Sequence, residues 1–538
     1  MEKRTLIALA LSFMVIGFYP LILQKFYPDY YKKTSHASSA KPAAARAEAG
    51  SAVEKLVNAG AFSPENDMSF QNGSLQLAFN KKDGGIREIH FPRLTDSETS
   101  RPIRFISLKD LGVSSTALVL TSGGDSSLVT DHSGEVRGSG VSLSAAALGG
   151  KVKVTKNFEF SDGYSADLKI RFENTTDAPL EMSYEFLVGS GVAPRHSIDS
   201  QYIEANFFSE ADGKKSLKHL KESRSGKQVQ SSSAVRWVSI KDRHFSVIVK
   251  PKAEDSMTGL VRGLGGHDFS ASLVSSKRTL APRTSFEEEL LLYVGPNELD
   301  DLLPLGLEDL VNFGKFDPIG KLFVGALELL QKICRSYGLA IIALTAFINL
   351  VLFPLTRVSY MSMKRMQLIQ PQMNKLREHH KKNPDKLNKE MMELYKKHKV
   401  NPFGGCIPMI VQIPIFIALY VALSKSVILI NSKFLWIKDL SSPDRVYLPF
   451  SVPFAGNYIH LLPLLMVAAM AVQQKFTQIK MENQDPAMQT QQKMMAVMMP
   501  VIFGFVFYQM PSGLVLYWLT NTLIMSAYQL RLKSMTLT

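Results

Sequence analysis

Five long apolar runs in the C-terminal part of the chain constrain its fold more than any other feature. Each has roughly 17 to 26 residues, which is enough to cross a bilayer as a helix that rises about 1.5 Å per residue. A helix satisfies its own backbone hydrogen bonds, as hydrocarbon requires. The runs therefore predict five membrane helices, over 338–356, 405–430, 459–477, 493–509 and 513–531.

A sixth apolar run follows the basic start Met1-Glu-Lys-Arg4. A cleaved signal peptide would also begin with a basic segment. The apolar part is long for a signal core, however, and no small-x-small site follows it directly. We therefore predict an uncleaved membrane anchor over 1–24, followed over 25–60 by a linker whose Ser/Ala/Lys-rich part is typical of a flexible tether.

The distribution of charge orients these helices. The segment 357–399 carries twelve Lys and Arg against four acidic residues, a net charge of +8 out of +14 for the chain. Basic loops stay in the cytoplasm, so this segment is predicted to be cytoplasmic. With six crossings both termini are then cytoplasmic too. The large polar segment 61–297 and the loop 431–458 lie on the outer side.

The segment 61–297 has the pattern of an all-β domain. Short runs of alternating apolar and polar residues recur between turn signals, as in a β-sandwich. We find no metal-ligand spacing, nucleophile elbow or phosphate loop, so no catalytic residue, metal or cofactor is predicted, and His244 is expected to be an ordinary surface residue. Cys334 and Cys406 lie at opposite ends of the helical bundle, and no disulfide is expected. The clearest strand signals are at 74–79, 151–155, 166–172, 182–187 and 245–249.

An amphipathic helix is predicted over 318–335, between the β-domain and the first of the five membrane helices. Because it leads into a membrane helix, we expect it to lie in the outer membrane interface. Packing on the β-sandwich is the alternative. Its apolar face comprises Ile319, Leu322, Phe323, Ala326, Leu330 and Ile333, and its polar face Lys321, Glu328, Lys332 and Arg335.

The basic segment 357–400 is predicted to form a helical hairpin. Apolar residues recur at helical spacing on both arms, and Asn383 followed by Pro384 suits the start of the second arm. The basic surface is suited to anionic lipid headgroups or to ribosomal RNA, although a merely solvated face explains the composition equally well. The basic residues chosen for this surface are Lys375, Arg377, Lys381 and Lys382.

Two amides form the core of a candidate polar site. Asn349 and Gln412 each lie seven residues from the cytoplasmic end of a predicted helix, about 10 Å along the axis. Thr345, Tyr517 and Asn521 are placed at mid-membrane or farther out. A simple interhelical hydrogen bond is the alternative, but Pro408 and Pro414 and the adjoining basic hairpin favour a polar cavity open to the cytoplasm. Methionine is also concentrated here, with 18 of 23 from Met361 onward, as core filler or as an adaptable binding surface.

Six short motifs are spread over the helical part of the chain. They are Phe353-Pro-Leu-Thr356, Gln370-Pro371, Met391-Met-Glu-Leu-Tyr-Lys396, Asn401-Pro-Phe-Gly-Gly-Cys406, Gln412-Ile-Pro-Ile-Phe416 and Pro511-Ser-Gly-Leu-Val-Leu-Tyr517. In these motifs the chain resembles the YidC/Oxa/Alb family of membrane protein insertases, in the bacterial form with a large periplasmic domain. The resemblance implies a polytopic bundle of six membrane helices, five of them forming the core, together with a periplasmic β-supersandwich of galactose-mutarotase-like shape and a cytoplasmic helical hairpin.

One position departs from the family pattern. Members usually carry an arginine five residues before the proline that matches Pro354, and this chain has Asn349 there. The function implied is insertion and folding of inner-membrane proteins through a hydrophilic groove, here without a fixed charge. Apolar substrate segments would leave along Ile413, Phe416, Met498 and Phe505.

The partners implied are nascent membrane proteins, the Sec translocon, the ribosome and signal recognition particle pathway and anionic lipids, with no DNA. A transporter or channel, or a membrane-anchored carbohydrate-binding or carbohydrate-modifying protein, are the alternatives.

Overall fold

The chain divides into two compact units, Met1–Val53 and Glu54–Thr538. The computed structural model describes residues only within the second unit, so the predicted anchor 1–24 and linker 25–60 lie outside the described residues, as do Lys381, Lys382 and 401–406. The described residues are 67–97, 99–107, 113–194, 197–211, 214–220, 226–253, 257–265, 268–311, 317–380, 383–398, 400, 407–452, 456–477 and 486–534.

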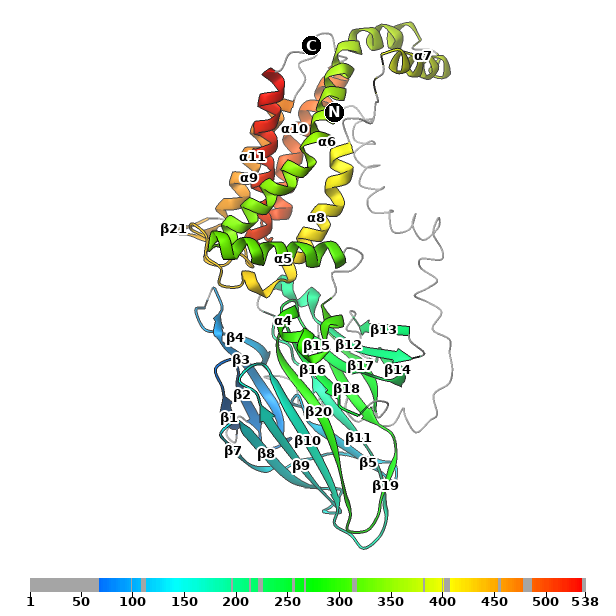
Figure 1. Ribbon diagram of the computed structural model, residues 1–538, viewed down its shortest axis with the longest axis vertical. Coiled ribbons are helices and arrows are strands. Elements are labelled where there is room, and N and C mark those ends of the chain that lie inside the picture. Colours follow the sequence, from blue (N-terminus) through cyan, green and yellow to red (C-terminus); the bar gives the residue numbers. More distant parts are fainter. Residues whose placement is uncertain are drawn as a thin grey trace. The chain divides into compact units, whose positions relative to one another are not determined.

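The first half of the described chain folds into three antiparallel sheets (Figure 1). Within the described residues, one sheet has the order β1 (Asp67–Gln71), β2 (Gln76–Asn80), β3 (Gly85–Thr95), β4 (Pro102–Ser107). The largest has the order β13 (Lys214–Leu220), β12 (Glu204–Ala211), β15 (Trp237–Lys241), β16 (Phe245–Pro251), β20 (Ser285–Pro296), β10 (Ser165–Asn174), β9 (Val152–Phe160), β8 (Gly140–Ala147), β7 (Ser133–Arg137). The third has the order β14 (Gln228–Ala234), β17 (Met257–Gly265), β18 (Asp268–Ser275), β11 (Leu180–Gly189), β5 (Leu118–Ser122), β6 (Asp125–Leu128), with β19 (Arg278–Leu280) paired to β11.

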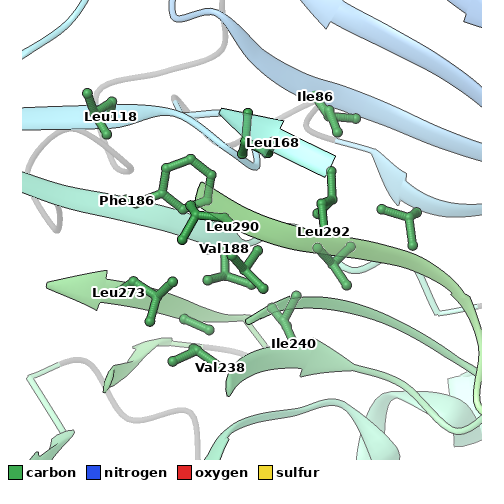
Figure 2. Close-up of a cluster of buried hydrophobic side chains, with 14 of the residues drawn as sticks. Ile86, Leu118, Leu168, Phe186, Val188, Val238, Ile240, Leu273, Leu290 and Leu292 are labelled. Carbon is green, nitrogen blue, oxygen red and sulfur yellow. The ribbon is translucent and has the colours of Figure 1, made fainter. Parts of the chain in front are cut away.

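The core lies between these sheets and confirms the predicted all-β sandwich. In β9 and β10 buried and exposed residues alternate almost without a break, so each strand places one face inward. Figure 2 shows Leu168, Phe186 and Leu292, from three different strands, pointing into one apolar cluster. The predicted strand segments coincide with β2, β9, β10, β11 and β16. His244 was placed wrongly at the surface, because the turn before β16 folds inward and leaves only 1% of it exposed.

The second half is helical. Short turns, α4 (Leu299–Leu302) among them, lead from β20 to α5 (Asp317–Cys334), and the remaining helices are α6 (Tyr337–His379), α7 (Pro384–Lys397), α8 (Ile407–Lys425), α9 (Leu461–Thr477), α10 (Pro486–Phe507) and α11 (Ser512–Ser534). One stretch of the described chain, Tyr337–Met366, is a helix long and apolar enough to cross a bilayer by itself. Shorter apolar helical stretches are Ile410–Lys425, Leu461–Lys475 and Val497–Phe507.

Two predicted segments hold structural detail that the sequence pattern did not show. The predicted membrane span 338–356 and the first arm of the predicted hairpin form one helix, which continues through Pro354 and Pro371 to His379. The apolar run ends where the charges begin, yet helical backbone bonding needs no apolar side chains, and a proline removes only one bond of the ladder. The predicted loop 431–458 also contains structure, because β21 (Val446–Val452) pairs with β22 (Gly456–Ile459).

Helix α5 makes its main helix contacts with α6 and α8. Phe323 and Leu327 are buried in the apolar core that these helices share. The apolar face predicted as one surface therefore divides in two, because Leu322 and Ile333 are 67% and 72% exposed.

A lysine is fully buried inside the sandwich. The Lys156 ammonium donates hydrogen bonds to the carbonyl oxygens of Gly84 and Thr116. Burial lowers the pKa of Lys156 to about 8, although the carboxylate of Asp83 opposes this shift. Burial, and secondarily the charge of Lys156, lowers the pKa of nearby His132 to about 3. His132 is therefore neutral at physiological pH, and Lys156 is the group that titrates.

This lysine predicts a pH dependence of stability. Its folded pKa of about 8 lies below the ordinary value of 10.5, so between these values the unfolded chain binds the extra proton. The free energy of unfolding of the sandwich should therefore rise as pH increases from about 8 to about 10.5. Pulse proteolysis in urea measures it. In Lys156→Met the free energy of unfolding should no longer rise over this pH range. In Lys153→Met, which changes the exposed face of the same strand, it should still rise. Equal slopes in both variants would contradict the assignment.

Candidate functional site

Two residues of helix α11 accept hydrogen bonds from the two amides predicted from the sequence. Its Tyr517 and Asn521 are four residues apart, so they lie on one face of the helix. Asn349 of α6 donates from Nδ2 to Oδ1 of Asn521 at 2.9 Å. Gln412 of α8 donates from Nε2 to the hydroxyl of Tyr517. Three helices that are far apart in sequence thus meet at two adjacent polar pairs.

The hydrogen bonds give each amide a partner on α11. Tyr517 and Asn521 were predicted to lie at mid-membrane or farther out than the amides, and each is bonded directly to one of them. Asn349 and Gln412 bond to α11 about one helical turn apart, and within the described residues no hydrogen bond joins the two amides to each other.

The site is closely packed. Asn349 is 3% exposed, Tyr517 is 1% exposed and Thr345 is fully buried. Asn349 also donates to the carbonyl oxygen of Thr345, and the Thr345 hydroxyl donates to that of Ile341. Gln412 and Asn521 are half-buried. Every one of these side chains is an amide or a hydroxyl, so the predicted site is polar but carries no formal charge.

Sequence reasoning missed further polar residues along the same helices. On α6, Thr356 and Ser359 continue the face of Thr345 and Asn349 at helical spacing, and Ser359 is 4% exposed. On α11, Thr522 and Ser526 donate their hydroxyls to carbonyl oxygens one turn earlier. Thr356 ends the predicted membrane helix 338–356 and Ser359 lies just beyond it in the predicted hairpin, so their helical spacing from Asn349 could have found both.

The four residues chosen for substrate exit do not share one surface. Ile413 and Phe505 are exposed, at 49% and 85%. Met498 is half-buried. Phe416 packs instead among aromatic rings, with its centroid 4.9 Å from that of Trp518. An apolar exposed face therefore exists on both α8 and α10, and Phe416 stabilises the packing behind it.

The segment after the long apolar part of α6 folds back through α7. Ile369, Met373 and Val400 form a small buried cluster between the two arms. Asn383 accepts a hydrogen bond from the backbone N–H of Lys386, and Pro384 is the first residue of α7, which confirms the predicted cap. Of the chosen basic residues, Lys375 is exposed and Arg377 half-buried. Among the described residues no group of His, Cys, Asp and Glu is arranged to hold a metal ion.

Comparison with known proteins gives the family. Residues 68–326 match the family described as the YidC periplasmic domain, and residues 329–537 match the family described as 60Kd inner membrane protein. The chain is 33% identical over 573 residues to the membrane protein insertase YidC of Pelobacter propionicus, with 98% of each chain covered. The chain belongs to the YidC family.

Other YidC proteins are similarly close. The membrane protein insertase YidC of Geobacter metallireducens is 31% identical over 560 residues, again with 98% of each chain covered. Among solved structures, the active YidC insertase with its first transmembrane domain resolved matches with a TM-score of 0.37 at 19% identity, over 88% of this chain and 95% of that chain. The family matches establish an inner-membrane protein with a periplasmic β-domain.

Proposed function

We propose that this chain is a membrane protein insertase and folding chaperone that works without a cofactor, and that the polar pairs between α6, α8 and α11 receive the substrate. The observation that carries this proposal is the pairing of Asn349 with Asn521 and of Gln412 with Tyr517 across three helices. Without substrate, the two side chains of each pair hydrogen-bond to each other. A polar group of a nascent segment would replace one side chain of a pair as the hydrogen-bond partner of the other.

The energetics suit such an exchange. Interhelical hydrogen bonds in membranes contribute only about 0.6 kcal/mol on average, so opening one costs little. An unsatisfied backbone polar group in hydrocarbon costs several kcal/mol. A path lined by amides and hydroxyls therefore lowers the cost of bringing a polar flank partway into the membrane, even without a charged side chain.

We further propose the topology that the charge pattern predicts. Six helices cross the membrane, both termini and the α6–α7 hairpin are cytoplasmic, and the β-sandwich is periplasmic. The apolar part of a substrate would pass Ile413 and Phe505 into lipid, since both are exposed. Nascent membrane proteins, the Sec translocon, the ribosome and signal recognition particle pathway, and anionic lipids at Lys375 are the proposed partners.

Photo-crosslinking of stalled nascent chains tests the site. A crosslinking residue at Gln412 should form adducts with a small membrane protein over a limited range of chain lengths. The same residue at Leu435, which is 76% exposed beyond the end of α8, should not form them over that range. Absence of adducts at Gln412 at every chain length, or equal adducts at both positions, would contradict the proposed substrate path.

A further inference from the structure

A cavity of about 280 Å³ lies apart from the polar pairs, where the sandwich, the segment after β20, α5 and the end of α8 meet. It is at the small end of the range of about 300–1,000 Å³ that is usual for ligand pockets. Its walls are polar and carry both signs of charge. The residues used below are Arg243, Glu298, Asp300, Lys321, Val324 and Glu328.

One wall presents a buried guanidinium. Arg243 is 6% exposed. Its Nη1 donates to Asp199 at 3.1 Å, and its Nε donates to the carbonyl oxygen of Ser424 near the end of α8. Its Nη2 has no hydrogen-bond partner among the described residues. A buried donor of this kind is costly when left unpaired, and guanidinium groups favour phosphate oxygens.

The cavity is also lined by three carboxylates, Glu298, Asp300 and Glu328. None of Glu298, Asp300 and Glu328 forms an ion pair with a cation of the described residues. Burial, and then the charges of Asp301, Glu328 and Asp300, raises the pKa of Glu298 to about 7. Burial and the charge of Asp300 also raise the pKa of Glu328. A cation would relieve this repulsion, and the described residues offer no metal-binding group. An organic ammonium fits these walls.

Helix α5 connects the cavity to an apolar surface. Lys321, Val324 and Glu328 line the cavity on one face of the helix. Leu322, Leu329 and Ile333 form a separate exposed stripe, about 130° around the axis from that face at about 100° per residue. A molecule with acyl chains on the stripe would therefore have its polar head at the cavity.

We infer that this cavity binds the headgroup of a phosphatidylethanolamine-type lipid, with the phosphate on Arg243 and the primary ammonium on Glu298, Asp300 and Glu328. A primary ammonium donates three hydrogen bonds, which matches a wall of carboxylates. A trimethylated choline headgroup has no N–H to donate. The site is distinct from the polar pairs and does not depend on the proposed insertase function.

Native mass spectrometry of the full chain tests this site. Protein released from nanodiscs with equal amounts of phosphatidylethanolamine and phosphatidylcholine should retain one ethanolamine lipid in preference to the choline lipid. Glu328→Gln should reduce that preference by about tenfold, the loss expected for a charge-assisted hydrogen bond. Arg243→Gln should instead reduce the retention of both lipids by about tenfold, because both carry the phosphate. Arg335→Gln, at an exposed position just after the same helix, should leave both the preference and the retention unchanged.

Three outcomes would overturn the inference. One is equal retention of both lipids by the unmodified protein. Another is an unchanged preference in Glu328→Gln. This result is decisive by itself, even if Arg243→Gln fails to fold. The last is displacement of the lipid by soluble glycerophosphoethanolamine together with no effect of Leu322→Asn and Leu329→Asn, because the site would then belong to a soluble phosphorylated amine.

Discussion

Replacing Asn349 by leucine is expected to reduce membrane insertion by about tenfold, and to do so more than replacing it by arginine. In the proposed path the leucine removes the amide of Asn349 that a polar group of the substrate would bind, in addition to the bond with Asn521, and a polar group left unsatisfied at a buried site costs about 1–3 kcal/mol. That range includes the 1.4 kcal/mol that corresponds to a factor of ten. Arginine keeps donors at this position and restores the residue usual in the family. Insertion of a small membrane protein into proteoliposomes measures both.

The control for this experiment is Phe347→Leu. Phe347 lies two residues earlier on α6 and is 62% exposed, so its replacement changes apolar surface without touching the polar pairs. It should leave insertion near the unmodified level. Full activity of both Asn349→Leu and Asn349→Arg would show that polarity at this site is dispensable.

Replacing Glu185 by alanine is expected to destabilise the sandwich by about 3–5 kcal/mol, the usual cost of leaving one partner of a buried ion pair alone. Glu185 accepts two hydrogen bonds from Arg262, at 2.6 and 2.9 Å. The two side chains are 1% and 3% exposed, so neither charge has access to water. Urea unfolding of the full chain, followed by pulse proteolysis of the sandwich, measures the loss.

Two variants separate charge from packing. Glu135→Ala removes a carboxylate from an exposed pair with Arg137, whose side chains are 53% and 80% exposed, and should cost at most about 1 kcal/mol. The double variant Glu185→Leu with Arg262→Met replaces both charges by apolar groups and should recover most of the stability. If the double variant is as unstable as Glu185→Ala, the loss comes from packing and not from an uncompensated charge.

The elements that could be predicted from the sequence are those whose pattern reports burial directly. Strands such as β9 and β10 alternate because one face is buried, and Asn383 with Pro384 marks a helix start through local bonding. Helix α5 was harder, since packing on α6 and lipid exposure select the same apolar residues. His244 was misjudged because burial of a polar turn depends on distant neighbours.

In the candidate site, too, local sequence patterns could be predicted and tertiary packing could not. Asn349 and Gln412 could be selected because amides are rare in apolar runs. Tyr517 and Asn521 were selected as well, but their pairing with the two amides could not be predicted, because it depends on the packing of α11 against α6 and α8. The cavity beside Arg243 left no signal in the sequence, as its walls come from segments up to about two hundred residues apart.

The continuity of α6 has a mechanical consequence. The helix has 43 residues and is therefore about 65 Å long, roughly twice the thickness of a bilayer's hydrocarbon core. Asn349 lies on the same rod as the arm that packs against α7. A push or pull on that arm would reach the Asn349–Asn521 pair as a movement of the helix itself, with Pro354 between them as the natural point of bending. A partner that binds the hairpin could therefore change the geometry of the polar site without touching it.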